Sequence, residues 1–115
     1  MVYPAGGAVT RGKNIATPMA MPGPLSDLTV IDLSRVLAGP YATMVLADLG
    51  AEVIKVEPLG GDSTRRLLGS GAGFFSVFNR NKQSLAVDVK HPLGLEIVLK
   101  LIADADVFCE NFKTG

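Results

Sequence analysis

Cysteine is nearly absent from this sequence, since Cys109 is the only one among 115 residues. A single cysteine excludes an internal disulfide framework and a metal site built from several cysteines, and it suits a reducing compartment. A nucleophilic thiol would need a base beside it, and nothing in the local sequence brings the one histidine, His91, close to it. We therefore expect Cys109 to be a small buried residue of a strand, and we expect no metal site.

An excess of charge of one sign is also missing. Eleven basic and eleven acidic residues give a formal net charge of zero. This balance provides no electrostatic reason to expect a nucleic acid or an anionic membrane surface as partner. No apolar run reaches the roughly 18 residues of a membrane span. The hydrophobic fraction of 48% is enough for one folded domain with one modest core.

The first 23 residues differ in composition from the rest. They contain two basic residues, Arg11 and Lys13, and no acid, but they lack the apolar segment of a secretory signal. Their prolines and glycines oppose the amphipathic helix of a mitochondrial presequence. We expect a disordered leader over residues 1–23 and a cytoplasmic protein, with the mitochondrial matrix as the alternative.

Apolar runs and turn residues predict alternating strands and helices from residue 24 onward. Strands are expected over residues 28–33, 52–57, 84–89 and 107–110. Helices are expected to begin at Pro40 and Pro92, and 74–78 is expected to form a short helical turn. Short connections of this kind favour β-α-β units and a parallel sheet, so the fold class is α/β. Two helices cannot cover both faces of four strands well, so the architecture looks incomplete.

The spacing of apolar residues also predicts which helical faces are buried. In the first helix, the predicted buried residues are Tyr41, Met44, Val45 and Leu49, and Gly50 is the expected stop. In the second helix, they are Leu93, Ile97, Val98, Leu101 and Ile102.

The turn after the first strand lacks the glycine-rich fingerprint of dinucleotide-binding proteins. It reads SRVLAGPYA, with one glycine, Gly39, followed by Pro40, which has no N–H to donate to a phosphate. Glu57 ends the second strand where a ribose-binding acid would stand, but a single acid there is common. The usual mode of NAD or FAD binding is therefore disfavoured.

Two polar loops have alternative interpretations. Residues 60–65, GGDSTR, form either an anion-binding nest with Arg65 or Arg66 as counter-charge, or a flexible turn, and the spacing favours the turn. Residues 79–82, NRNK, bind phosphate or form a polar turn, and again the turn is favoured. Asp32 and Asp88 lie near strand ends, where an acid is more often a cap than a catalyst. No P-loop, HExxH or Ser-His-Asp pattern is present.

Two long segments resemble the family III CoA-transferases, the CaiB/BaiF type, which also includes α-methylacyl-CoA racemases. Residues 24–65 read PLSDLTVIDLSRVLAGPYATMVLADLGAEVIKVEPLGGDSTR, and residues 79–115 read NRNKQSLAVDVKHPLGLEIVLKLIADADVFCENFKTG. The resemblance implies that residues 24–115 are a partial Rossmann-like CoA-binding domain. It would be the incomplete N-terminal part of a larger fold that forms an interlocked homodimer.

The resemblance also implies an activity. Family transferases move CoA between an acyl-CoA and a carboxylic acid through an aspartyl mixed anhydride. Their catalytic aspartate would lie beyond residue 115, so we expect no catalytic residue in this chain and no cofactor besides CoA or acyl-CoA as substrate. Two alternatives stay open. One is a 2-methylacyl-CoA racemase that works by acid/base chemistry, and the other is an inactive, truncated fragment that binds CoA or self-associates.

The resemblance places CoA contacts in three segments. These are the turn Val36, Leu37 and Ala38, the strand end Val87, Asp88, Val89 and Lys90, and the pair Asn111 and Phe112. Two positions depart from the family pattern. Leu37 stands where formyl-CoA transferase has a glutamine, which argues against a formyl/oxalate substrate pair, and Pro58 stands where some members have an arginine.

Overall fold

A four-stranded parallel sheet forms the centre of the computed structural model, which describes residues 22–114. The strands are β1 (Thr29–Asp32), β2 (Glu52–Glu57), β3 (Gln83–Ala86) and β4 (Val107–Cys109), and they lie in the order β3-β2-β1-β4. Every neighbouring pair is parallel. This is the order of the first four strands of a Rossmann fold, so the predicted α/β class is confirmed. The expected leader lies outside the described residues apart from residues 22 and 23.

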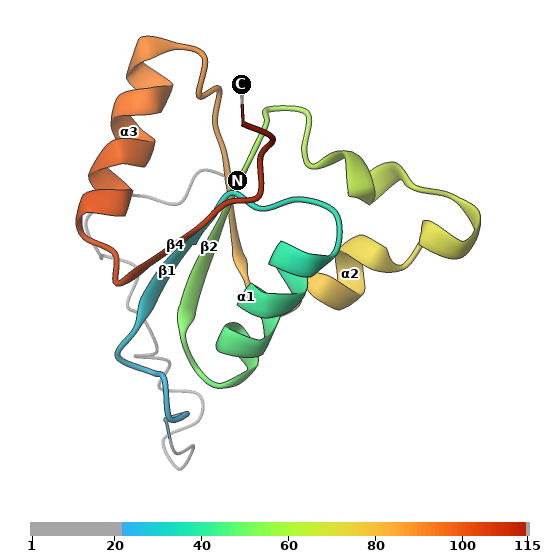
Figure 1. Ribbon diagram of the computed structural model, residues 1–115, viewed down its shortest axis with the longest axis horizontal. Coiled ribbons are helices and arrows are strands. Elements are labelled where there is room, and N and C mark those ends of the chain that lie inside the picture. Colours follow the sequence, from blue (N-terminus) through green and yellow to red (C-terminus); the bar gives the residue numbers. More distant parts are fainter. Residues whose placement is uncertain (1–21, 115) are drawn as a thin grey trace.

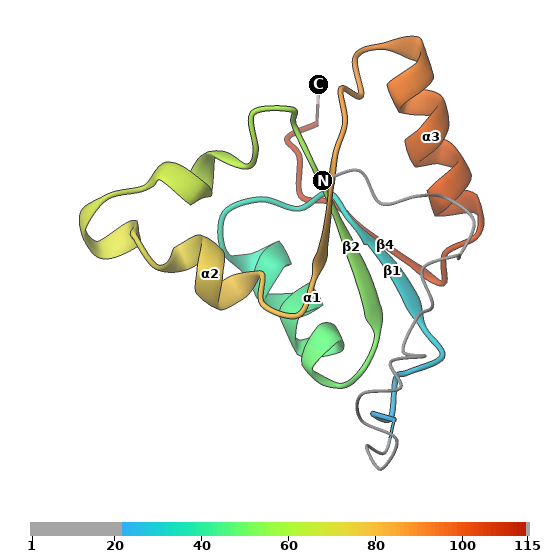
Figure 2. The ribbon, with the colours of Figure 1, turned by 180° about the vertical axis from the view of Figure 1, so that it is seen from behind.

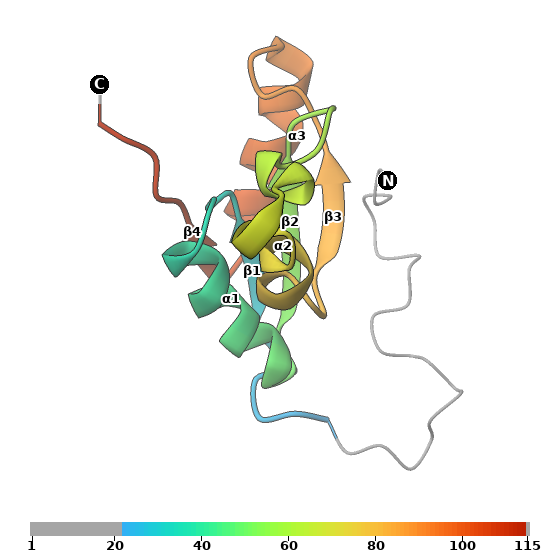
Figure 3. The same cartoon turned by 90° about the vertical axis from the view of Figure 1, so that its right-hand side faces the viewer.

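Helices lie on both faces of the sheet. Figures 1 and 2 show α3 (Pro92–Ala103) on one face, with α1 (Ala38–Asp48) and the short α2 (Phe74–Phe78) on the other. Figure 3 views the sheet with α1 and α2 toward the reader. Two short 3-10 helices, η1 (Ser63–Arg66) and η2 (Gly69–Gly71), lie between β2 and α2.

Alternation along the strands divides the core into two layers. Ile54 and Val56 of β2 pack with Val98 of α3. Val53 of β2 instead packs with Val30 and with Ala47 of α1. Lys55 and Glu57 point to the same side of β2 as Val53, because side chains alternate along a strand. Both charged side chains are buried on this α1 side of the sheet.

The buried face of α1 differs from the predicted one. Its buried residues are Pro40, Thr43, Met44 and Ala47, whereas Tyr41, Val45 and Leu49 are exposed. Only Met44 was predicted correctly. The reason is a close approach of the start of α1 to the turn after β1: a Cβ on Gly39 would lie 2.3 Å from the Cβ of Ser34. Apart from Met44, the buried face therefore carries smaller residues, and the larger apolar residues Tyr41, Val45 and Leu49 are exposed.

The buried face of α3 was predicted correctly only in its second half. Val98 is buried, and Leu101 and Ile102 pack against the core, but Leu93 and Ile97 are exposed. The first turn of α3 packs through Gly94 against the chain that follows β3, where a Cβ would lie 2.0 Å from the carbonyl oxygen of Asp88. None of the helices within residues 22–114 is long and apolar enough to cross a membrane.

The third strand is displaced from its expected span. It ends at Ala86 rather than at residue 89, and a turn takes the chain into α3. Cys109 lies in β4, as expected, but it is half-buried. Burial raises the pKa of its thiol, which keeps it protonated and is consistent with a packing role.

Candidate functional site

A pocket of about 490 Å³ opens at the carboxyl end of the sheet. Segments that end or follow all four strands line it: Leu33 and Arg35 after β1, Val56 to Leu59 at the end of β2, Val87 to Lys90 after β3, and Phe112 after β4. The strand order reverses between β1 and β4. Open α/β sheets bind ligands at this edge and at this reversal, so the topology itself marks the pocket as a candidate site.

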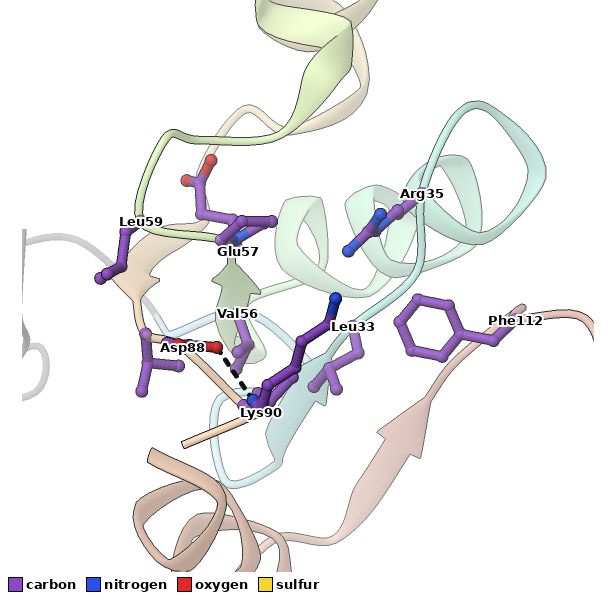
Figure 4. A pocket seen from close by; sticks show the side chains of 11 residues that line it. Leu33, Arg35, Val56, Glu57, Leu59, Asp88, Lys90 and Phe112 are labelled. Atoms are coloured by element: carbon purple, nitrogen blue, oxygen red, sulfur yellow. Dashed lines mark hydrogen bonds between the residues drawn. The ribbon is translucent and has the colours of Figure 1, made fainter. Parts of the chain in front are cut away.

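Two cations contribute to the pocket wall. Figure 4 shows the side chains of Arg35 and Lys90 directed into the same space, with the Phe112 ring beside Arg35. The guanidinium carbon of Arg35 lies 5.3 Å from the centre of that ring. Within residues 22–114, no carboxylate forms an ion pair with Arg35 or Lys90. The pocket thus holds two positive charges that are available to an anionic ligand.

The two acids of the pocket are otherwise engaged. The carboxylate of Asp88 accepts a hydrogen bond of 2.9 Å from the backbone N–H of Lys90, which shapes the turn after β3. Glu57 is paired with Arg65 on the other side of the sheet edge. The remaining lining is mostly apolar, with Leu33, Val56, Val87, Val89 and Leu59 among it. An apolar surface beside two cations suits a ligand with both a phosphate and an apolar part.

Glu57 and Arg65 form a two-pronged ion pair beneath the glycine-rich loop. Nη2 and Nε of Arg65 donate to the two carboxylate oxygens at 2.6 and 2.8 Å, and the guanidinium carbon lies 3.8 Å from the centre of the Phe75 ring. Although burial alone would raise it, the hydrogen bonds from Arg65, Ser84 and the backbone of Asp62 lower the pKa of Glu57 to about 2. Arg65 is therefore committed to Glu57 and does not face the pocket.

Lys55 and Asp62 form a second pair, which is fully buried. Their charged atoms lie 3.0 Å apart, and Lys55 also donates to the carbonyl oxygen of Ser34 at 3.0 Å. Asp62 in turn accepts from the backbone and the hydroxyl of Thr64. Burial opposes the ionised form, but these hydrogen bonds and Lys55 hold the pKa of Asp62 below its usual range. The expectation of a flexible turn over residues 60–65 is therefore wrong, because buried ion pairs hold this loop in place.

The NRNK segment is a polar turn, as predicted, and its charges have protein partners. Arg80 pairs with Asp48 of α1 at 2.7 Å on the surface. Lys82 extends inward and pairs with Asp32 at 2.9 Å. We call Asp32, Ser34, Thr43, Lys55, Glu57, Asp62, Thr64 and Lys82 the buried polar cluster. It supports the pocket edge from the α1 side.

The turn between β1 and α1 is held by Asn111, which follows β4. Its side-chain oxygen accepts from the backbone N–H of Arg35 at 2.9 Å, and its side-chain nitrogen donates to the Arg35 carbonyl at 2.8 Å. Val36, the residue after Arg35, has a backbone φ of 70°. A β-branched residue in this left-handed region is strained.

The predicted CoA-contact residues divide into two groups. Val87, Asp88, Val89, Lys90 and Phe112 line the pocket. The other group lies next to the pocket but does not line it: Val36, Leu37 and Ala38 of the turn after β1, and Asn111.

Sequence reasoning missed Arg35, which is the second cation of the pocket. Its position could have indicated it, because Arg35 directly precedes Val36 in the turn after the correctly predicted first strand, where such sheets bind ligands. Within the described part of the chain, no cluster of His, Cys, Asp and Glu could hold a metal ion.

The family model of CoA-transferase family III matches residues 25–115. This chain belongs to that family. Human succinyl-CoA:glutarate CoA-transferase is 50% identical over 97 residues, which are 80% of this chain and 22% of that protein. Succinyl-CoA:mesaconate CoA-transferase of Haloarcula hispanica is 48% identical over 101 residues, 81% of this chain and 26% of that protein.

A family structure has the same fold. The crystal structure of a CaiB/BaiF family protein from Brucella suis superposes with a TM-score of 0.74 at 44% sequence identity, over 81% of this chain and 27% of that one. The chain thus spans about a quarter of the length of these family III relatives.

Proposed function

We propose that this chain is the CoA-binding part of an enzyme that transfers CoA between an acyl-CoA and a carboxylic acid. Membership in family III supports the reaction class. The observation that carries the assignment to this pocket is the pair Arg35 and Lys90, two cations without acidic partners among the described residues, at the carboxyl edge of a parallel sheet.

The chemistry of CoA matches the two halves of the pocket. Its nucleotide carries phosphates, which the ammonium of Lys90 and the guanidinium of Arg35 bind by charge-assisted hydrogen bonds. Its adenine ring and pantetheine arm offer apolar surface, which Val56, Val87 and the Phe112 ring would cover. The two cations would thus hold the phosphates, and the apolar lining would contact the adenine ring and the pantetheine arm.

Four aspartates of this chain are poor candidates for the nucleophile of the transfer reaction. Asp32 and Asp62 are held in buried ion pairs, Asp48 is paired with Arg80, and Asp88 accepts from its own turn. In the proposed reaction a carboxylate attacks the thioester carbonyl, an acyl–carboxylate anhydride forms, and CoA leaves as the thiolate. That carboxylate would come from outside residues 22–114.

The racemase alternative has less support. Both curated relatives described above are named as CoA-transferases. Racemisation would need an acid/base pair near the α-carbon of the acyl group. Like the nucleophile of the transfer reaction, this pair would come from outside residues 22–114, because the two acids of the pocket wall, Asp88 and Glu57, already accept hydrogen bonds from the protein. The two relatives therefore favour transfer.

The test is a CoA titration of the ¹⁵N-labelled chain followed by two-dimensional NMR. Millimolar CoA should shift amides of the segments around Arg35, Leu59, Lys90 and Phe112, and leave the exposed outer side of α3 unchanged. The same spectra report whether the chain is folded. A folded chain whose pocket amides do not move would overturn the proposal, and so would shifts confined to a different surface.

A further inference from the structure

The side chain of Asn111 is matched to the backbone of one residue, Arg35, which lies 76 positions earlier in the chain. The amide oxygen accepts from the Arg35 N–H, and the amide nitrogen donates to the Arg35 carbonyl. A side-chain amide carries one acceptor oxygen and an NH₂ donor, so it satisfies both backbone groups at once. Neither aspartate nor alanine could replace it in both bonds. Each polar atom of the side chain thus makes a hydrogen bond within the protein, to the backbone of Arg35.

The backbone that Asn111 holds is strained. Val36 has a φ of 70°, a conformation that valine rarely adopts and that is disfavoured by about 1–3 kcal/mol. Such a conformation persists only when its surroundings enforce it. On one side, the Ser34 N–H donates to buried Asp32 at 2.8 Å. On the other, the Tyr41 N–H donates to the Leu37 carbonyl at 2.8 Å, where α1 begins.

The packing around the turn leaves room for this arrangement and little else. Gly39 faces both Ser34 and Asn111, and a Cβ there would lie 2.3 Å from the Cβ of Ser34 and 3.4 Å from Nδ2 of Asn111. The absence of a side chain at Gly39 therefore leaves room for Ser34, whereas a Cβ there would only touch Asn111.

The direction of a pocket cation depends on this turn. Arg35 precedes strained Val36, and Phe112 follows Asn111 directly, so the two hydrogen bonds join the segments that carry the ring and the guanidinium. The two groups lie 5.3 Å apart in the pocket wall. If the hydrogen bonds were lost, Val36 would relax toward a negative φ and the Arg35 side chain would turn away.

We propose that Asn111 is a positioning residue that forces Val36 into a strained conformation and thereby aims Arg35 at the anionic part of the ligand. This inference rests on the proposed binding of CoA in the pocket. It differs from the expectation that Asn111 contacts the amides of CoA itself, because Asn111 acts through Arg35.

The two roles are separated by a double-mutant cycle that relieves the strain. Glycine adopts a positive φ readily, so in Val36→Gly the turn no longer needs to be forced into shape. CoA affinity is measured for wild type, Asn111→Ala, Val36→Gly and the double variant. We expect Asn111→Ala to weaken binding about tenfold in the wild-type background, and less than about threefold in the Val36→Gly background. An equal loss in both backgrounds would overturn the proposal, because a direct ligand contact is lost to the same extent whatever residue 36 is.

Hydrogen exchange of the Arg35 amide tests the same idea without ligand. In the wild-type chain this amide should be protected, although Arg35 lies in an exposed turn, and Asn111→Ala should speed its exchange about tenfold or more. An Arg35 amide that already exchanges in wild type as fast as an unstructured one would contradict the proposal, even if the variant fails to fold. A protected Arg35 amide in a chain that does not bind CoA would instead support the positioning and refute the proposed function.

Discussion

Lys82 and Asp32 form an ion pair in the interior of the protein. Nζ of Lys82 lies 2.9 Å from Oδ2 of Asp32, and the two side chains are 1% and 0% exposed. Asp32 also accepts from the Ser34 backbone and from Thr43 at 2.6 Å. The pair joins the segment before β3 to the end of β1, and so fixes the sheet edge from which the pocket is built.

Removing the charge of Lys82 should destabilise the fold strongly. Lys82→Met keeps the length of the side chain but leaves Asp32 buried and unpaired, which should lower the free energy of unfolding by about 3–5 kcal/mol. Adding Asp32→Asn should recover part of the loss, since no unpaired charge remains. Urea unfolding followed by circular dichroism measures both variants. The matched control is Arg80→Ala, which removes an exposed pair with Asp48. It should have far less effect, and an equal effect of the two variants would contradict the account.

Glu57 should make stability depend on pH in the acid range. Its pKa is about 2 in the folded protein against an ordinary value of 4.5, so the folded state holds fewer protons between these two values. Its contribution is complete above pH 4.5 and is lost as the pH falls toward 2. From about pH 5 to about pH 3, wild type should lose about 2 kcal/mol more stability than Glu57→Gln. Glu96→Gln, at an exposed pair on α3, is the control and should follow wild type. Parallel curves for wild type and Glu57→Gln would refute the assignment.

Gly39 should tolerate no side chain. In Gly39→Ala the new methyl group would meet buried Ser34, which cannot move without disturbing Asp32. We expect a loss of about 1–3 kcal/mol in the free energy of unfolding, by thermal or urea denaturation. Gly60→Ala is the matched control, because a Cβ there meets nothing within 4 Å, and its effect should stay within about 0.5 kcal/mol. Equal stability of the two variants would show that Gly39 does not approach Ser34 this closely.

The outer side of α3 should promote self-association of the chain. Leu93 and Ile97 lie on one flank of the exposed Glu96–Lys100 pair, and Leu95 and Leu99 lie on the other; all four are between 45% and 64% exposed. Among the described residues, α3 is the only helix on its face of the sheet. An exposed apolar surface of this kind is usually covered by other protein. Sedimentation velocity at micromolar concentration should show oligomers, and Leu99→Glu should shift them toward monomer. A compact wild-type monomer would contradict this prediction.

The strands and the sheet type were predictable from the sequence, whereas the packing of α1 was not. Short apolar runs with turn residues between them gave strands 28–33, 52–57 and 107–110 to within two residues. The first helix is apolar on most sides, so its pattern does not select a buried face. The close contact between Gly39, at the start of α1, and Ser34, in the turn after β1, decides it.

The pocket was predictable in part. The resemblance pointed to Lys90 and Phe112, which the fold brings together from β3 and β4. Lys55 and Glu57 within a buried strand were a signal that charged partners had to exist, because unpaired buried charges are unstable. Their partners, Asp62 and Arg65, lie in a loop that is held in shape by these same ion pairs. The local sequence of the loop therefore did not reveal its conformation. Arg35 likewise enters the pocket only because the turn after β1 is bent back by a residue after β4.

Calorimetric titration with CoA tests the central claim most directly, when wild type is compared with Lys90→Ala. Loss of a charge-assisted contact to a phosphate should weaken binding about ten- to a hundredfold, which corresponds to roughly 1.5–3 kcal/mol. Lys100→Ala is the control, because Lys100 lies on the outer side of α3 and is 75% exposed. We predict that Lys100→Ala binds CoA with wild-type affinity. Lys90→Ala should bind CoA about ten- to a hundredfold more weakly, although its circular dichroism spectrum shows that it is folded. Equal CoA affinity in a folded Lys90→Ala variant would show that the pocket at the sheet edge is not the CoA site.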